Sequence, residues 1–262
     1  MKQRIVTGVF GAIVFLTLVY AGERWFSLFV LLLAMIGLFE FLLMAGIRAF
    51  TLPGLLSYVL LISILWPQLL IGKGNELSFS LLLMPVTILL LFYSVYRKNK
   101  FHIEHAALTI LGALYIGYGF MYMLATRNVP DTGLSLTILV LLGIWSTDSG
   151  AYFVGKAFGK RKLWPEISPN KTVEGALGGL FISILVVGAA NQIFGTLSVS
   201  DALAISLVAG VVGQMGDLIE SAMKRHFGVK DSGYIFPGHG GVLDRCDSWL
   251  IVFPILHLFD LI

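Results

Sequence analysis

Long stretches of this chain carry no charged side chain and are long enough to cross a membrane as helices. A bilayer core about 30 Å thick needs about 20 apolar residues in helical form. Six runs approach or exceed this length, the second interrupted only by Glu40, and three others are shorter. The six long runs are Ile5–Gly22, Trp25–Ile47, Ala49–Gly72, Leu77–Tyr96, Ala106–Ala125 and Gly175–Ser200, and the short ones are Leu134–Thr147, Ala202–Gly216 and Ser248–Phe259. Because the runs are continuous rather than alternating, a strand barrel is excluded. The pattern predicts an all-α integral membrane protein, a polytopic bundle of about nine transmembrane helices.

Composition agrees with this interpretation. The chain is 57% hydrophobic and 13% charged, against about 25% charged residues in ordinary soluble domains. The N-terminal run lacks a small-residue cleavage pattern and is followed by many apolar runs, so we expect a retained first helix rather than a signal peptide. Cys246 is the only cysteine, which excludes an intrachain disulfide. The net charge of +3 gives no indication of a nucleic-acid partner.

Basic residues are distributed unequally between alternate loops. If the N-terminus is cytoplasmic, 15 Lys and Arg residues fall on the cytoplasmic side and 3 on the other. This asymmetry predicts a multi-pass protein of the cell membrane with a cytoplasmic N-terminus and an external C-terminus. Two long, glycine-rich, charged loops, 155–174 and 224–243, then face the cytoplasm, where a nucleotide would arrive. Because the polar residues crowd into the second half, we predict a transmembrane scaffold over 1–100 and a catalytic region over 101–262.

The three short runs are each bounded by an aspartate on the predicted cytoplasmic side. At 1.5 Å per residue, Ala202–Gly216 spans roughly 22 Å and Ser248–Phe259 roughly 18 Å, which is less than the hydrocarbon thickness. Asp148, Asp217 and Asp247 would therefore lie below the membrane surface, where acidic groups normally line a cavity or bind a cation. The alternative is that the bilayer thins locally and leaves the charges at the interface. Three such helices on one side favour a polar cavity open to the cytoplasm.

Spacing places the acidic residues on shared helix faces. Asp217, Glu220 or Ser221, and Lys224 recur at i, i+3/i+4 and i+7. Asp244 and Asp247 are three residues apart and also share a face. Carboxylate pairs directed at one cavity would repel each other without a cation, and an oxygen-only ligand set suits Mg²⁺. The alternative is that Asp217 and Glu220 form salt bridges with basic residues one turn later.

The two charged loops carry groups suited to phosphate. Glycines of the 224–243 loop, Gly240 and Gly241 among them, permit close backbone approach to a ligand, and consecutive N–H groups can form an anion nest. In the 155–174 loop, the segment S-P-N-K-T-V-E-G places Ser168, Lys171 and Thr172 just before a helix, where hydroxyls can cap it and the lysine can reach a phosphate. The spacing is not that of a P-loop. The same loop could instead be a basic stretch attracted to anionic head groups.

The segment from Ser221 to Asp247, S-A-M-K-R-H-F-G-V-K-D-S-G-Y-I-F-P-G-H-G-G-V-L-D-R-C-D, resembles the signature of the phosphatidate cytidylyltransferase family. The upstream segments D-S-G-A-Y-F-V-G-K and S-P-N-K-T-V-E-G also resemble blocks of that family. The resemblance implies the Mg²⁺-dependent reaction CTP + phosphatidate → CDP-diacylglycerol + pyrophosphate, a step of phospholipid biosynthesis, at the cytoplasmic leaflet. Membrane lipid surrounds such an enzyme. Whether two copies form a homodimer is left open by the sequence.

On this basis we expect two sets of site residues, one that binds metal and acts in catalysis and one that binds substrate. Asp217 and Asp244 would bind Mg²⁺, with Asp247 as a further ligand or as a partner of the ligands. Lys224 and Arg245 would act with these carboxylates in catalysis, and His239 would donate to the leaving pyrophosphate or stabilise its own loop. The residues expected to bind substrate are Ser168, Lys171, Thr172, Arg225, Lys230, Gly240 and Gly241.

Three other functions are compatible with parts of the sequence. A cation-coupled transporter also places polar residues at membrane depth, but the charges here gather at one face and no repeat relates the two halves. A CDP-alcohol phosphotransferase has a differently spaced aspartate array, which is absent. A family variant acting on another phosphorylated lipid, such as a prenyl phosphate, stays open. Glu40 is alone in its helix and could be a packed, protonated carboxyl.

Overall fold

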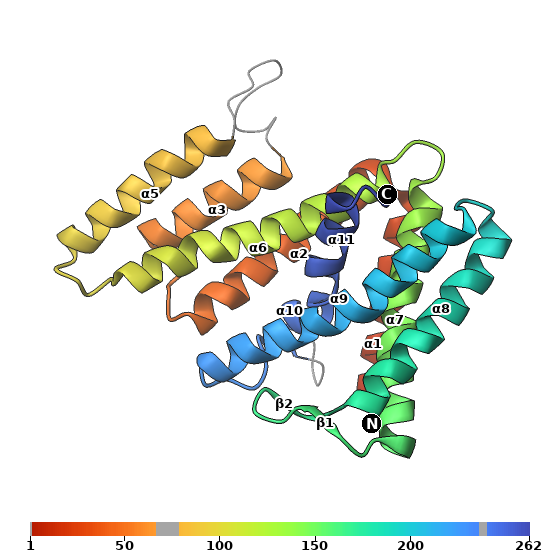
Figure 1. Ribbon diagram of the computed structural model, residues 1–262. Coiled ribbons are helices and arrows are strands. Elements are labelled where there is room, and N and C mark those ends of the chain that lie inside the picture. The colour runs from red at the N-terminus through yellow and green to blue at the C-terminus, as the bar shows by residue number, and fades with distance from the viewer. Residues whose placement is uncertain (1, 67–78, 236–239) are drawn as a thin grey trace.

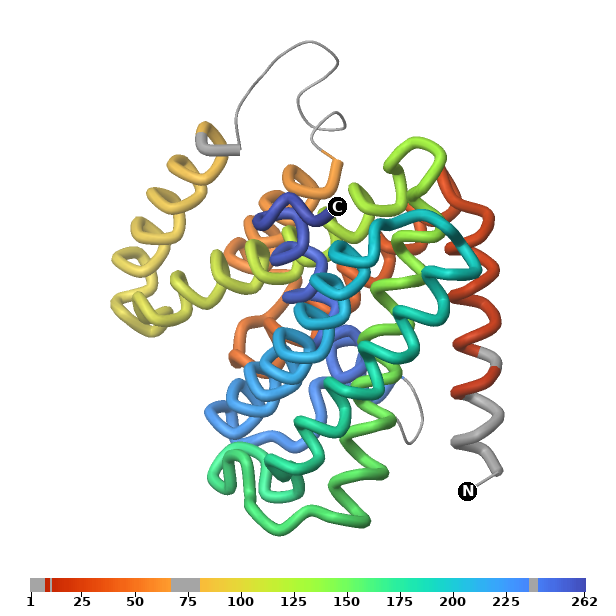
Figure 2. The backbone as a smooth tube through the Cα atoms, turned by 45° about the vertical axis from the view of Figure 1, so that its right-hand side comes forward, coloured from red at the N-terminus to blue at the C-terminus, as the bar shows by residue number. Residues whose placement is uncertain are grey.

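The structure is a computed structural model that describes residues 2–66, 79–235 and 240–262. Its order of elements is α1 (Lys2–Ala21), α2 (Glu23–Met44), α3 (Leu52–Leu65), α5 (Phe79–Tyr96), α6 (Ile103–Arg127), α7 (Gly133–Phe158), β1 (Lys162–Trp164), β2 (Ser168–Thr172), α8 (Val173–Phe194), α9 (Val199–His226), α10 (Leu243–Cys246) and α11 (Trp249–Leu258). Helices α7, α8 and α9 lie side by side, whereas α3 and α5 pack beside α6 at the other side of the molecule (Figures 1 and 2).

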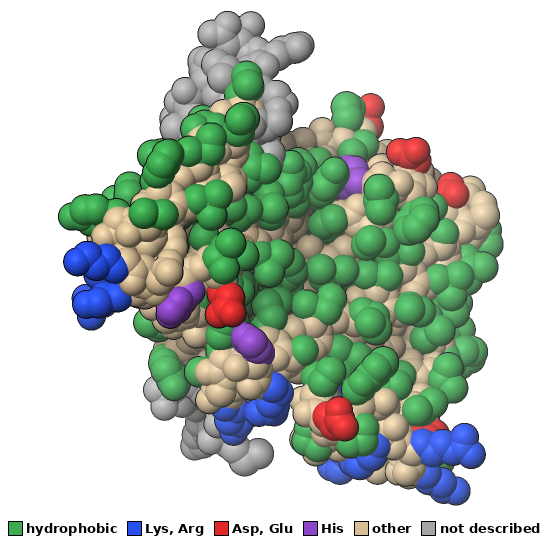
Figure 3. Space-filling view, turned by 60° about the vertical axis from the view of Figure 1, so that its left-hand side comes forward, with side chains coloured by type: hydrophobic (Ala, Val, Ile, Leu, Met, Phe, Trp, Pro, Cys, Tyr) green, Lys and Arg blue, Asp and Glu red, His purple; other side chains and the backbone are tan. Residues whose placement is uncertain are grey.

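Apolar helices form most of the molecule and present apolar side chains outward. Among the described residues, α2, α6, α7, α8 and α9 are each long and apolar enough to cross a membrane, and the other apolar helices are shorter. Large side chains such as Phe181 on α8 and Phe92 on α5 are 62% and 67% exposed. Hydrophobic atoms cover the middle of the face drawn in Figure 3, and Lys and Arg gather at its lower end and at its left. The prediction of an all-α, multi-pass membrane protein is therefore confirmed, while the number of nine spans stays a prediction.

Two of the three helices predicted to be short are in fact long. Helix α7 continues past Asp148 to Phe158, and α9 continues past Asp217 to His226. The uncharged runs mark only part of these helices, because the backbone hydrogen bonds continue through Asp148 and Asp217. For α9, the predicted shared face of Asp217, Glu220 and Lys224 already required this continuation. Only α11, with 10 residues, is short.

The 155–174 loop is smaller than predicted and contains two strands. The first residues of the predicted loop belong to the end of helix α7. Strands β1 and β2 then form an antiparallel hairpin in which Lys162 lies opposite Thr172 and Trp164 opposite Ser168. Thr172 ends the hairpin and caps α8, because its hydroxyl accepts a hydrogen bond from the Gly175 N–H at 3.1 Å. Strands of three and five residues are too short to show a clear alternating pattern in the sequence.

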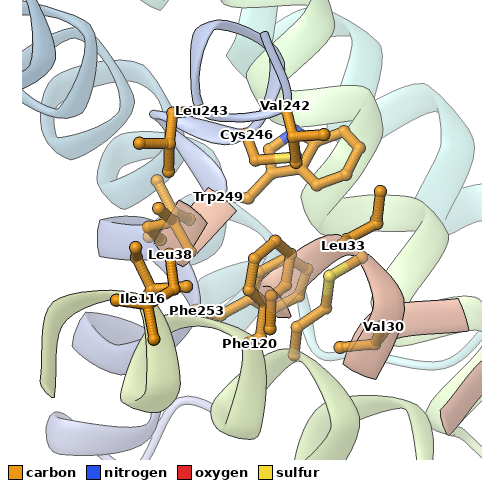
Figure 4. Packing of buried hydrophobic residues seen from close by; sticks show 14 of the residues in the cluster. Val30, Leu33, Leu38, Ile116, Phe120, Val242, Leu243, Cys246, Trp249 and Phe253 are labelled. Carbon is orange, nitrogen blue, oxygen red and sulfur yellow. The ribbon is translucent and has the colours of Figure 1, made fainter. Parts of the chain in front are cut away.

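Helices α2, α6 and α11 form the centre of the core. Figure 4 shows side chains of α2, α6 and α11 packed together, including Phe120 and Phe253, both fully buried. Gly119 of α6 lies directly against Leu250 of α11, where a Cβ atom would overlap the leucine. Small residues of this kind let helices in lipid approach closely. The core thereby fixes α11, and the loop that precedes it, against the N-terminal helices.

Candidate active site

A cavity of about 560 Å³ opens between α1, α2, α7, α9 and the segment that leads into α11. Several of its lining residues are acidic, and Asp148, Asp217 and Asp247 are all among them. These are the three aspartates predicted to converge, and they come from three different parts of the chain. The predicted polar cavity is therefore present, although two of the three helices that form it are longer than expected.

The aspartates are close enough to affect one another. Burial and the negative charge of Asp217 together raise the pKa of Asp247 to about 6. Its Oδ1 accepts a hydrogen bond from the Ser248 N–H at 2.7 Å, which partly offsets the cost of ionisation. A cation bound between Asp217 and Asp247 would relieve this repulsion.

Lys224 connects two acidic residues of the cavity lining. Its Nζ lies 2.6 Å from Asp244 Oδ1 and 3.3 Å from Glu220 Oε2. The Glu220 pair is the i,i+4 salt bridge that the spacing offered as an alternative, and it is confirmed. Asp217 instead pairs with Lys171 of β2, with 2.7 Å between Nζ and Oδ2, and accepts a hydrogen bond from Ser221 at 3.3 Å.

Asp244 is surrounded by donors of its own loop. Besides Lys224, its carboxylate receives hydrogen bonds at 2.8 Å from the Ser232 N–H, the Ser232 hydroxyl and the Gly241 N–H. Burial alone would raise the pKa of Asp244, but the hydrogen bond from Lys224 and those from the two backbone N–H groups lower it to about 2. The Gly241 N–H, predicted to meet substrate phosphate, is thus occupied by a carboxylate of the protein.

Several predicted substrate-binding residues lie outside the cavity lining. Thr172 is buried and caps α8, and Arg225 is exposed and donates to the Ile167 carbonyl at 3.4 Å, which ties α9 to the hairpin. Ser168 lies in β2, Lys230 is exposed beyond α9, and neither lines the cavity. Arg245 does line it, as do Lys224 and Asp244. Gly240 adopts a positive φ of 82° beside Asp244. His239 lies outside the described residues.

Apolar side chains also line the cavity, which was not predicted from the sequence. They include Phe15 of α1, Leu33 of α2, Trp145 of α7 and Trp249 of α11. The ring of Phe15 lies 4.8 Å from that of Trp249 and 6.3 Å from that of Trp145. Helices α1 and α2, predicted to be part of a scaffold, therefore form part of the lining of the site. The cavity as a whole suits a ligand with a charged head and an apolar body.

The carboxylates of the cavity fit the ligand requirements of some metal ions better than those of others. Within the described parts of the chain, no three His, Cys, Asp or Glu side chains are grouped tightly enough to form a protein-only metal site. Mg²⁺ does not need such a group, because it is usually bound by one or two carboxylates and completes its shell with water and substrate phosphates. Asp217 and Asp247 fit that requirement, since Asp217 is partly exposed to the cavity and Asp247 is next to it.

Comparison with known proteins agrees with this geometry. A profile of the cytidylyltransferase family matches residues 2–262. The chain is 47% identical over 260 residues to the phosphatidate cytidylyltransferase of Bacillus subtilis (strain 168), covering 98% of this chain and 96% of that protein. It is 42% identical over 261 residues to the phosphatidate cytidylyltransferase of Staphylococcus haemolyticus (strain JCSC1435), covering 98% of both. The chain therefore belongs to the cytidylyltransferase family.

Proposed function

We propose that this chain is a membrane enzyme that transfers a cytidylyl group from CTP to phosphatidate and releases pyrophosphate. The observation that carries the proposal is the mixed lining of the cavity, in which Asp217, Asp247 and Lys224 share one space with the apolar side chains of Trp145 and Trp249. A lipid phosphate needs both kinds of side chain at once. The names of the relatives supply the same substrate, and their near-complete coverage of the chain supports carrying it over.

The reaction requires little proton transfer by the protein. Phosphatidate is a phosphomonoester whose second pKa of about 6 leaves it mostly dianionic at neutral pH, so its oxygen can attack without a general base. The new bond forms to the α-phosphorus of CTP while the bond to pyrophosphate breaks in line. What the site must supply is cancellation of the repulsion between two anions and stabilisation of the charge that develops on pyrophosphate.

Lys224 and Arg245 are the cations best placed for that task, because both line the cavity. Lys224 is held in a fixed position by Asp244 and Glu220. Lys171 is held at the cavity edge by Asp217, and it would move to a phosphate when that carboxylate takes up another cation. Arg225 and Lys230 lie farther out, where they would attract the nucleotide as it arrives.

We further propose Mg²⁺ as the cofactor, bound by Asp217 and Asp247. When bound, it would neutralise phosphate charge and polarise the phosphoryl oxygens. Asp148 lines the same cavity and would orient water or substrate around them. Asp244 has a different role in this proposal: both of its oxygens already accept hydrogen bonds, so it orders Lys224 and the loop.

The proposed orientation places the cavity toward the cytoplasm of the cell. In support, many of the Lys and Arg side chains on the face drawn in Figure 3 lie toward its lower end, and in Figure 1 the N-terminus lies at the lower end while the C-terminus lies near the upper one. Cytoplasmic loops rich in Lys and Arg are the usual arrangement. Labelling of single cysteines introduced into the Cys246→Ala background, at the β1–β2 hairpin and at the C-terminus, would test it in intact cells. Labelling of the hairpin by an impermeant reagent would contradict this orientation.

A panel of lipid phosphates tests the substrate. Purified protein in detergent is incubated with CTP, Mg²⁺ and one of phosphatidate, lysophosphatidate, a polyprenyl phosphate or no lipid, and CDP-lipid and pyrophosphate are measured. We expect the highest kcat/KM with phosphatidate and no turnover without lipid. A higher kcat/KM with the polyprenyl phosphate would reassign the substrate, and absence of turnover with all of them would refute the proposed function.

A further inference from the structure

Glu40 is a buried acidic residue far from the predicted site in sequence, yet its side chain reaches the loop that carries Asp244. It lies near the C-terminal end of α2 and is only 2% exposed. Its Oε1 accepts a hydrogen bond from the Val242 N–H, and its Oε2 accepts one from the Leu243 N–H, both at 3.0 Å. The Ser232 hydroxyl lies 3.2 Å from the same Oε2. One carboxylate therefore joins α2 to both sides of the 224–243 loop.

The loop is shaped around this carboxylate. A Cβ atom at Gly233 or at Gly241 would overlap Glu40 oxygens, so both positions need glycine for the backbone to come this close. An acidic group inside an apolar helix is costly unless its oxygens are satisfied. Since Glu40 does not line the cavity, contact with substrate does not account for its presence.

The same loop groups connect Glu40 to the groups that face the cavity. The Ser232 hydroxyl lies between the two carboxylates, 3.2 Å from Glu40 Oε2 and 2.8 Å from Asp244 Oδ2. Gly241, next to Val242, donates its N–H to Asp244, and Asp244 in turn binds Lys224 at 2.6 Å. A shift of the Gly241–Leu243 backbone would therefore move both Asp244 and the ammonium group of Lys224.

We infer that Glu40 is a positioning residue: it fixes the backbone of Gly241–Leu243 so that Asp244 holds Lys224 in the cavity. The inference rests on the proposed function, because it gives Glu40 a part in that reaction without contact to either substrate. It also assigns α2 a role beyond that of a membrane anchor. The Glu40 carboxylate takes the place that a substrate phosphate would have in an open glycine-rich nest.

Two variants of Glu40 and one matched control test this. Glu40→Gln keeps the shape but offers one acceptor where two are needed, and Glu40→Ala removes both. Asn191→Ala is the control, because Asn191 is also buried and also makes two hydrogen bonds to backbone, both with Leu197 at the far end of α8. For each protein, kcat and KM for CTP are measured, together with hydrogen exchange of residues 240–248 and the melting temperature in detergent.

We expect kcat to fall by at least about tenfold in Glu40→Gln and further in Glu40→Ala, as for other groups that orient reactive residues. KM for CTP should change by less than about threefold, because Lys224 acts mainly on charge that develops in the transition state. Backbone exchange should accelerate over 240–248 and not elsewhere. Asn191→Ala should lower the melting temperature but leave kcat and the exchange of 240–248 unchanged.

The inference is overturned if both Glu40 variants keep kcat within about twofold of wild type. It is also overturned if their loss of kcat matches that of Asn191→Ala, or if faster exchange spreads over the whole chain, since either result describes a general loss of stability. If Glu40→Ala does not fold, Glu40→Gln decides. Wild-type protein that is inactive on CTP and phosphatidate would refute the proposed function instead, and the exchange of 240–248 would still test whether Glu40 fixes the loop.

Discussion

Replacing Asp244 by asparagine removes the charge that holds Lys224 while keeping the size of the side chain. In the structure Asp244 is 6% exposed and accepts four hydrogen bonds, from Lys224 Nζ, the Ser232 N–H and hydroxyl, and the Gly241 N–H. Asparagine has one acceptor oxygen, and its amide group would face donors on the other side. The substitution therefore either turns the amide group toward Lys224, which then keeps only Glu220 as a carboxylate partner, or leaves the N–H groups of Ser232 and Gly241 without an acceptor.

The expected cost follows from the electrostatics of the site. Lowering of the Asp244 pKa from its ordinary 3.8 to about 2 corresponds, at about 1.4 kcal/mol per pH unit, to about 2 kcal/mol in favour of the ionised carboxylate. A loss of about 2 kcal/mol lowers the melting temperature of a chain of this size by roughly 4–8 °C. Because Lys224 also loses its fixed position, we expect cytidylyltransferase activity to fall by about 10- to 100-fold.

The assay compares Asp244→Asn with Asp260→Asn, the same chemical change at an exposed residue in a positive-φ position that asparagine tolerates. Thermal unfolding in detergent and initial rates of CDP-lipid formation are measured for both. A double-mutant cycle with Lys224→Met measures the interaction between Asp244 and Lys224, and we expect a coupling energy of at least about 1 kcal/mol. Wild-type melting temperature and activity in Asp244→Asn, or a coupling energy near zero, would refute this view of the site.

Three further substitutions test other parts of the account. Thr172→Ala removes the cap of α8 and should cost about 1 kcal/mol, seen as a lower melting temperature, with KM for CTP within about twofold of wild type; a KM raised by tenfold would instead place Thr172 at the substrate. Gly216→Ala puts a Cβ atom against the Asp247 backbone and should lower the free energy of unfolding by about 1–3 kcal/mol and reduce activity. An unchanged melting temperature together with unchanged activity would contradict the close packing of α9 and α11. Lys171→Gln removes the ion pair with Asp217 and should raise KM for CTP by about tenfold with a smaller change in kcat, and an unchanged KM would exclude Lys171 from nucleotide binding.

Much of the site could be predicted from sequence because its residues lie on regular elements. Helical spacing placed Asp217, Glu220 and Lys224 on one face, and all three line the cavity. The convergence of Asp148, Asp217 and Asp247 was also predicted, but partly for the wrong reason. Helices α7 and α9 do not stop at these residues, and it is the packing of α7, α9 and α11 that brings them together.

The rest depends on contacts between distant parts of the chain, which spacing does not encode. Glu40 and the glycine-rich loop are separated by about 200 residues, and only the fold shows that the loop's N–H groups bind protein carboxylates. The lone acidic residue in an apolar run was a signal, but it had no indicated partner. The apolar lining formed by Phe15 and Trp249 was hidden for a different reason, since aromatic residues occur throughout the membrane helices.

The most direct test of the central claim is the release of pyrophosphate from CTP by the purified protein, measured with and without phosphatidate and compared between wild type and Asp217→Asn. We expect release that requires both phosphatidate and Mg²⁺, that matches CDP-diacylglycerol formation one to one, and that falls by at least about 100-fold in Asp217→Asn. Release that is independent of phosphatidate, or wild-type rates in Asp217→Asn, would contradict the assignment of this cavity as the site of cytidylyl transfer.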